Sequence, residues 1–146
     1  MNRADWTARI TGAVSQFWYD QGVAVLDEFT LKTNRRVDLI CLDDQQNITV
    51  IEIKSSDEDF LADRKWQEYL DWADRFFFAI PEHFTLSLLP DDDRCGIIIT
   101  DGFSCHIQKH PVQAPLHASR RQHLLRRLAH VAMDRHFRLK SGLTSG

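Results

Sequence analysis

The sequence contains few cysteines and no long apolar segment. Its three cysteines, Cys41, Cys95 and Cys105, are an odd number without C-x-x-C spacing, which argues against a disulfide framework and predicts reduced thiols in the core. No apolar run approaches the roughly 20 residues that cross a bilayer, and the N-terminus lacks the apolar centre of a signal peptide. We therefore expect a cytoplasmic protein without a membrane segment.

Several catalytic motifs are also missing. The seven histidines include no H-E-x-x-H pattern, so a zinc site is not expected. The segment Gly102-Phe-Ser-Cys-His106 lacks the second glycine and the following helix of a nucleophile elbow, which argues against a serine or cysteine hydrolase. No glycine-rich phosphate loop occurs in the chain. Any chemistry must come from other residue types.

The charges that are present are unevenly distributed. The formal net charge is only −3, with 43% hydrophobic and 27% charged residues, as in an ordinary globular domain. From Ser119 to Lys140, however, seven Lys and Arg residues accompany a single acid, Asp134. Such a basic helix can follow a phosphate backbone, but it is as often a solvated face or a contact for an acidic partner.

Apolar periodicity predicts an α/β fold. Helical spacing occurs in residues 5–20, in a segment that begins after Ser55-Ser56 and carries Trp66 and Tyr69 on one stripe, and in residues 119–140. Strand-like runs lie between these helices, and Asp101-Gly102 is a strong hairpin signal. The predicted strands cover residues 23–31, 36–41, 48–54, 75–80, 96–100 and 103–107.

Two charged residues interrupt an apolar strand in residues 48–54. Glu52 and Lys54 are two positions apart, so both side chains point to the same face of the strand. The polar run from Asp43 to Asn47 predicts a hairpin turn, which would bring Asp38 of the preceding strand beside Glu52. We therefore expect two carboxylates and one ammonium group to converge.

This combination of groups suits phosphodiester hydrolysis. Carboxylate oxygens are the ligands of Mg²⁺ and Mn²⁺, so Asp38 and Glu52 are the candidate metal ligands. A bound ion would polarise a phosphoryl oxygen and lower the pKa of a water molecule, while Lys54 orients that water or stabilises negative charge. Glu28 is either a third acidic residue of the site or a solvated carboxylate at a strand edge.

Other basic residues are candidates for DNA binding, each with a plain solvated alternative. Arg35 and Arg36 flank the turn before Asp38, and Lys65 belongs to the helix that follows Lys54. The remaining candidates lie in the basic C-terminal segment and are Arg120, Arg121, Arg126 and Arg127.

Several segments together resemble the MmcB family of bacterial DNA repair proteins. They include Arg35 to Leu39, Ile51 to Ser56 and Asp74 to Ala79, and above all the pattern Asp-Phe-x-x-Asp-x-Lys-Trp-x-x-Tyr from Asp59 to Tyr69. The resemblance covers nearly the whole chain. Asp38 with Glu52-Ile53-Lys54 is similar to the D…E-x-K signature of the PD-(D/E)XK nuclease superfamily, although Val37 replaces the proline that precedes the aspartate there.

The resemblance implies a restriction-endonuclease-like core of helix, three-strand antiparallel meander, helix and strand, with an added C-terminal hairpin and basic helix. The chain length predicts one domain of this type over residues 1–140, and the short polar segment over 141–146 predicts a disordered tail. By position, Asp38 and Glu52 would be metal ligands, Lys54 the catalytic lysine and Glu28 an accessory acid.

Three functions are consistent with the sequence. The first is a Mg²⁺- or Mn²⁺-dependent DNA nuclease in repair. The second is a non-catalytic module on the same fold that binds DNA or other repair proteins. The third is a protein–protein adaptor without nucleic-acid contact. A homodimer is left open, because no dimer patch is evident.

Overall fold

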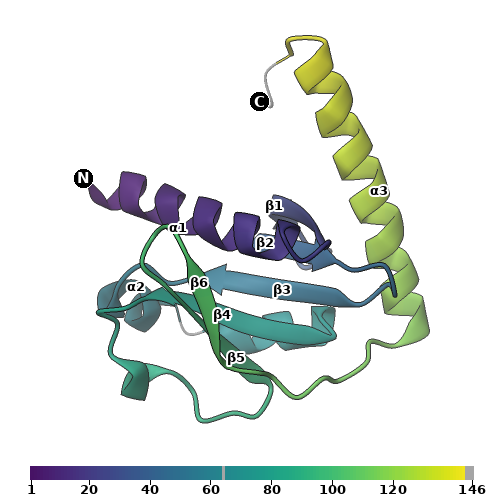
Figure 1. Ribbon diagram of the computed structural model, residues 1–146. Helices are drawn as coiled ribbons and strands as arrows, with labels where there is room; N and C mark the ends of the chain where they lie inside the picture. The colour runs from purple at the N-terminus through teal and green to yellow at the C-terminus, as the bar shows by residue number, and fades with distance from the viewer. Residues whose placement is uncertain (64, 144–146) are drawn as a thin grey trace. The chain divides into compact units, whose positions relative to one another are not determined.

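The computed structural model describes residues 1–63 and 65–143 (Figure 1). Backbone contacts divide the chain into two units, Met1–Pro115 and Leu116–Gly146, and each is described by itself. The single domain over residues 1–140 stays a prediction. Within the predicted tail, the backbone N–H groups of Ser141 and Leu143 donate to helix carbonyls, and residues 144–146 lie outside the described part of the chain.

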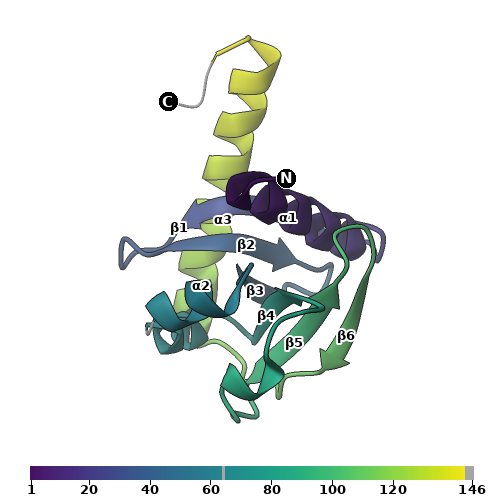
Figure 2. The ribbon, with the colours of Figure 1, turned by 90° about the vertical axis from the view of Figure 1, so that its left-hand side faces the viewer.

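The first unit is built on a mixed six-stranded sheet with the strands in sequence order (Figure 2). The first three strands form the predicted antiparallel meander. β4 and β5 follow in parallel, and β6 returns antiparallel through the predicted Asp101-Gly102 turn. The mixed α/β prediction is therefore confirmed. The strands are β1 Ala24–Thr30, β2 Arg36–Leu42, β3 Ile48–Ile53, β4 Arg75–Pro81, β5 Cys95–Thr100 and β6 Cys105–Lys109.

Helix α1, Arg3–Tyr19, covers one face of this sheet. Its buried stripe of Ile10, Val14 and Trp18 packs on the central strands. The rings of Trp18 and Phe77 meet edge to face, with their centroids 5.4 Å apart. Phe76 and Phe78 alternate to the opposite face. There they contact the aromatic rings of α2 and of the following turn. β4 is thus buried on both faces, as predicted.

The second helix differs from the sequence prediction. In place of one long helix, α2 covers only Asp57–Ala62 and is followed by a 3₁₀ helix, η1, over Trp66–Trp72. Asp63 leaves the helical conformation, with φ −108° and ψ 111°, and its carboxylate accepts a hydrogen bond from the backbone N–H of Lys65 at 3.0 Å. The three buried aromatic residues of η1 are spaced three apart, Trp66, Tyr69 and Trp72, which matches three residues per turn.

Three smaller predictions for this unit are confirmed. The segment between β4 and β5 is a loop with one 3₁₀ turn, η2, over Leu86–Leu88. All three cysteines are free, and Cys41 and Cys95 are buried. Gly102 adopts φ 95° in the hairpin turn, a conformation that glycine reaches without strain.

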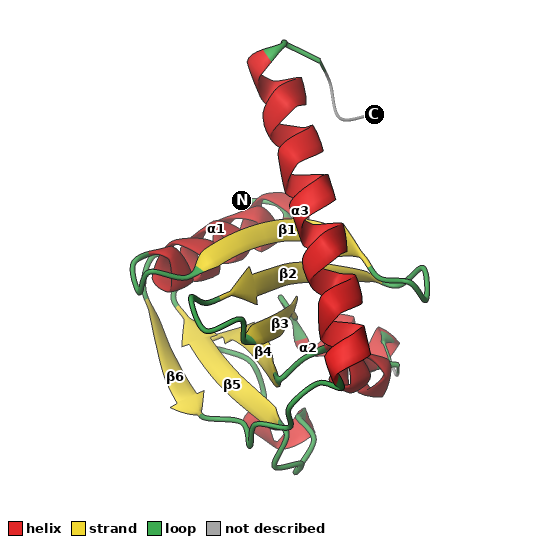
Figure 3. Cartoon of the chain, turned by 90° about the vertical axis from the view of Figure 1, so that its right-hand side faces the viewer, coloured by secondary structure: helices red, strands yellow, loops and turns green. Residues whose placement is uncertain are grey.

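The second unit contains helix α3, Ala118–Lys140, close to the predicted range 119–140 (Figure 3). Its N-terminus is capped by the His117 side chain, which accepts from the Ser119 backbone N–H at 3.3 Å. Arg138 and Lys140 occupy the last turn, where the helix dipole favours cations. No helix among the described residues has both the length and the apolar content needed to cross a membrane.

Gly96 of β5 is closely packed against its neighbours, and substitution at this position tests that packing. A Cβ atom at this position would lie 2.6 Å from the ring of Phe77 and 2.7 Å from Pro111, and Phe77 is itself enclosed in the core. We expect Gly96→Ala to lower the free energy of unfolding by about 1–3 kcal/mol through overpacking, measured by urea denaturation. In Gly12→Ala the new Cβ meets nothing within 4 Å, so this control should be stabilised by about 1 kcal/mol. Equal stability of the two variants would contradict the packing described.

Candidate metal and catalytic site

The strands β2 and β3 separate at the position where Asp38 faces Glu52. Their last ladder pair is Leu39 with Ile51. Beyond it, the backbone N–H of Asp38 donates to Glu52 Oε1 at 3.1 Å, and the backbone N–H of Ile53 donates to Asp38 Oδ2 at 2.7 Å. Each carboxylate therefore takes the place of a carbonyl of its own strand, and the hairpin brings the two acids together as expected.

This acid pair lies in a poorly solvated position. Glu52 is only 4% exposed. Burial first, and then the negative charge of Asp38, raise the pKa of Glu52, although the bond from Asp38 N–H and the charge of Lys54 oppose the shift. Burial also raises the pKa of Asp38. The local environment therefore disfavours two bare negative charges and would be stabilised by a proton or a cation.

Lys54 lies directly beyond β3 and is also buried. Its backbone N–H donates to the carbonyl of Ala79 in β4 at 3.0 Å, and the residue is 5% exposed. Its ammonium group donates to Asp63 Oδ2 at 2.9 Å. The same positive charge opposes the rise in the pKa of both Asp38 and Glu52. Lys54 is thus close to the acid pair and is directly bonded to a different carboxylate.

Asp63 is a residue of this site that the sequence analysis did not identify. Burial alone would raise its pKa, but the Lys65 N–H bond and the bond and charge of Lys54 bring the pKa below its ordinary value. Arg35 approaches its other oxygen at 3.6 Å. The sequence placed Asp63 on the flank of a continuous helix, where an acid is unremarkable. The aromatic spacing of three in η1 is the signal that indicates the helix break and hence the turn of Asp63 toward Lys54.

Arg35 forms the outer part of the same charged network. Its Nε lies 3.2 Å from Glu68 Oε2, and its guanidinium group lies 5.6 Å from the centre of the Tyr69 ring. The Tyr69 hydroxyl contacts the Arg36 carbonyl at 3.5 Å. Arg35 is therefore held by acidic and aromatic neighbours, and its predicted role in DNA binding stays a prediction.

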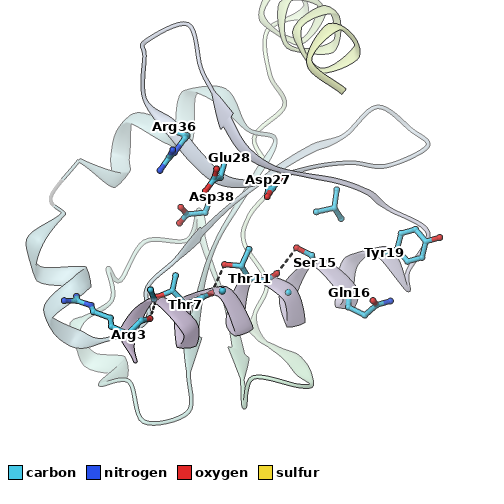
Figure 4. A pocket seen from close by; sticks show the side chains of 14 residues that line it. Arg3, Thr7, Thr11, Ser15, Gln16, Tyr19, Asp27, Glu28, Arg36 and Asp38 are labelled. Carbon is cyan, nitrogen blue, oxygen red and sulfur yellow. Dashed lines mark hydrogen bonds between the residues drawn. The ribbon is translucent and has the colours of Figure 1, made fainter. Parts of the chain in front are cut away.

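Glu28 stands next to Asp38 on the neighbouring strand. The register pairs Asp27 with Leu39 and Phe29 with Val37, which places Glu28 opposite Asp38, and Figure 4 shows the two carboxylates side by side. Glu28 has φ 47°, a conformation that is uncommon for residues with a side chain and is often found at functional sites. Its side chain is exposed, so it borders the site from the solvent side.

A groove leads to this edge of the site. It encloses about 1110 Å³ between one face of α1 and strands β1 and β2. Figure 4 shows Arg3 and Tyr19 at the two ends of the α1 face, with Asp38 and Arg36 across from it. Arg36, a predicted DNA contact, is exposed here. The groove gives a ligand access to Asp38.

The other predicted DNA contacts belong to η1 and to α3. Lys65 is exposed at the start of η1. Four further arginines belong to α3 in the second unit. Their roles in binding stay predictions. These four are Arg120, Arg121, Arg126 and Arg127.

The acid pair fits a divalent cation that retains several water molecules. Within residues 1–63 and 65–143, no three His, Cys, Asp or Glu side chains gather closely enough to hold a metal ion on their own. Mg²⁺ and Mn²⁺ need only one or two carboxylates with water in the remaining positions. Asp38 and Glu52 each use one oxygen for a backbone N–H, which leaves the second oxygen of each as the donor atom. Burial is the largest cause of the raised pKa of both groups, and nearby positive charge would favour their ionised forms.

The raised pKa of Glu52 predicts a pH-dependent stability in metal-free buffer. Because the folded protein binds this proton more tightly than the unfolded chain does, stability should fall as pH rises above the ordinary glutamate pKa of 4.5. Each pH unit costs the folded state at most about 1.4 kcal/mol. In EDTA, we expect the melting temperature of the wild type to fall relative to that of Glu52→Gln between about pH 5 and about pH 8. In a buffer with Mg²⁺ in place of EDTA, the difference between the two melting temperatures should be smaller. Parallel curves for the two proteins would contradict the assignment of a buried, under-compensated carboxylate.

Known proteins share both the fold and the sequence pattern. The chain resembles the solved structure of the SPO1766 protein of unknown function from Silicibacter pomeroyi, with 33% sequence identity and a TM-score of 0.87 over 100% of this chain and 97% of that one. No curated protein matches the sequence. The family profile described as DNA repair protein MmcB-like matches residues 2–142, which confirms the resemblance inferred from the sequence. The chain belongs to the MmcB-like family of DNA repair proteins.

Proposed function

We propose that this protein is a Mg²⁺- or Mn²⁺-dependent deoxyribonuclease that acts in DNA repair. The observation that carries the proposal is the pair formed by partly buried Asp38 and buried Glu52, close to the ammonium group of Lys54. The name of the family supports a role in DNA repair. The order of helix, three antiparallel strands, helix and parallel strand supports a restriction-endonuclease-like core of the PD-(D/E)XK type.

The proposed chemistry divides between the acid pair and the lysine. A divalent cation held by Asp38 and Glu52 would supply positive charge for a phosphoryl oxygen and lower the pKa of a water molecule. An ammonium group has three N–H donors, and the Lys54 bond to Asp63 uses one. The others are available to orient the attacking water or to stabilise the negative charge that develops on the phosphate.

Asp63 keeps the Lys54 side chain in place for this task. The stem of a lysine is flexible, so an amine without a partner could move. The 2.9 Å bond to Asp63 holds the Lys54 amine in place. Because Asp63 contacts the lysine and not the acid pair, we assign it a positioning role.

A non-catalytic binding module is the second candidate, and one observation favours it. Each carboxylate of the pair already accepts a backbone N–H across the point where β2 and β3 separate, and Lys54 is already paired with Asp63. The cluster can therefore hold the strands together without any reaction. DNA or another repair protein would then be bound by the exposed arginines.

Replacement of Glu52 separates these functions. We expect the wild type to cleave single-stranded, duplex or branched DNA in Mg²⁺ or Mn²⁺ and to lose activity in EDTA. Glu52→Gln should reduce cleavage by about 100-fold or more while DNA affinity in EDTA changes little. Gel assays and calorimetric titration with Mn²⁺ measure both effects. A wild type that binds DNA but cuts none of these substrates would support the binding module, and one without DNA affinity at low salt would support a protein–protein adaptor.

Replacement of Asp63 tests its positioning role. We expect Asp63→Ala to lower kcat about 10-fold with KM changed less than about 2-fold, because the amine is misplaced while DNA contacts persist. Asp63→Asn retains an oxygen acceptor for Lys54 and should recover part of the activity. The control is Asp44→Ala, an exposed acid in the β2–β3 turn, which should behave as the wild type. A KM effect as large as the kcat effect would instead assign Asp63 to DNA binding.

A further inference from the structure

The α1 face that lines the groove has an unusual composition for a solvent-facing helix surface. An exposed helix face normally carries long polar or charged side chains. Between Arg3 and Tyr19, the groove is lined chiefly by small residues. Short side chains leave the space between α1 and the strands open. These small residues are Ala4, Thr7, Ala8, Thr11, Gly12 and Ser15.

Gly12 shows that this openness is not required by packing. Apart from its chain neighbours and the backbone of its own helix, no atom lies within 4 Å of the position that its Cβ would occupy, so alanine would fit. Glycine in a helix interior costs about 1 kcal/mol relative to alanine. Helix stability therefore favours a larger residue here, whereas an unobstructed groove favours glycine.

The hydroxyl groups on the groove floor present a neutral surface. Thr7, Thr11 and Ser15 each donate to the carbonyl four residues earlier, at 3.0, 2.8 and 2.7 Å. Their donors are thus used within α1, and their oxygens and methyl groups face the groove. Such a floor neither attracts nor repels a phosphate, and its oxygens can accept hydrogen bonds from the amino groups of bases.

The two ends of the groove offer different contacts. Arg3 and Arg36 supply positive charge at the end near Asp38, and Tyr19 is 69% exposed at the other end (Figure 4). Acidic residues are also present in the lining: Asp27, Glu28 and Asp38. Because these three acids outnumber the two arginines, phosphates are favoured close to the arginines, and close to Asp38 only when a cation is bound there. A base can stack on the Tyr19 ring, a contact worth about 1–3 kcal/mol.

From this arrangement we propose that the groove between α1 and β1–β2 binds a single strand of DNA that passes Asp38. The inference rests on the proposed function, because it takes DNA as the substrate and Asp38 as part of the site. The volume of about 1110 Å³ is close to that of a site for a drug-sized ligand, roughly 300–1,000 Å³. It has room for a few nucleotides of one strand, whereas a duplex would bring a second strand and its charge into the same space.

Substitutions at Gly12 test the proposal without loss of the fold, since every residue except proline is a better helix former than glycine. Gly12→Trp fills the groove, and Gly12→Ala is the matched control. With a fluorescein-labelled single-stranded oligonucleotide in EDTA and low salt, anisotropy should show about 10-fold weaker binding for Gly12→Trp and a change below about 2-fold for Gly12→Ala. Binding of a blunt duplex should change equally little in both. Melting temperatures at or above that of the wild type confirm folding.

A second pair of variants distinguishes a nucleic acid from an uncharged ligand. Gly12→Lys and Gly12→Glu add side chains of similar length and opposite charge. The lysine variant should bind the single strand more tightly, with a salt dependence steeper by about one ion, and the glutamate variant more weakly. Equal affinities of these two variants, wild-type affinity of Gly12→Trp, equal loss of duplex binding, or a wild type without affinity for the single strand would each overturn the proposal.

The nuclease assignment can fail separately from the groove assignment. If the wild type cleaves DNA in Mn²⁺ and Gly12→Trp cleaves at the same rate, the groove proposal is wrong and the nuclease proposal stands. If binding of the single strand depends on Gly12 in the expected way but no DNA is cut, the groove proposal stands as a binding site and the nuclease proposal is wrong.

Discussion

The reciprocal hydrogen bonding between Asp38 and Glu52 is the interaction on which the site depends. Two antiparallel strands would normally continue their ladder, but here each strand offers a carboxylate oxygen to a backbone N–H of the other. The backbone groups remain satisfied while the strands move apart. The separation creates a polar position at the edge of a hydrophobic sheet, and it does so with the residues that would bind a cation.

The packing around this position explains why it can be rigid. β3 is buried along its whole length, between the α1 face and the aromatic face of the sheet. Parallel pairing with β4 extends one residue past the strand, through the Lys54 N–H bond to Ala79. The backbone that carries Glu52 and Lys54 is therefore fixed by the core. Only side chains are left to adjust when a ligand binds.

Sequence reasoning identified the parts of the site that depend on local pattern. The hairpin of β2 and β3 followed from alternation and turn residues, and it determined that Asp38 faces Glu52. It failed for Asp63 because helical periodicity and the acids of the first turn indicated a continuous helix, whereas Asp63 leaves the helical conformation and contacts Lys54. The groove was also not predicted from the sequence. Small residues in α1 appear as a neutral helix face until β1 and β2 are placed opposite them.

The balance of charge around the site distinguishes a structural network from a binding site. A buried network that only stabilises the fold is expected to be nearly neutral, because each uncompensated charge is costly to bury. Lys54 compensates Asp63 most directly, and Arg35 is shared between Asp63 and Glu68. The acid pair is therefore left with the more distant charge of Lys54, that of Arg36 near Asp38, and two backbone N–H groups, which do not prevent the pKa of Glu52 from rising. A divalent cation, as we propose, would supply the positive charge that this carboxylate pair lacks.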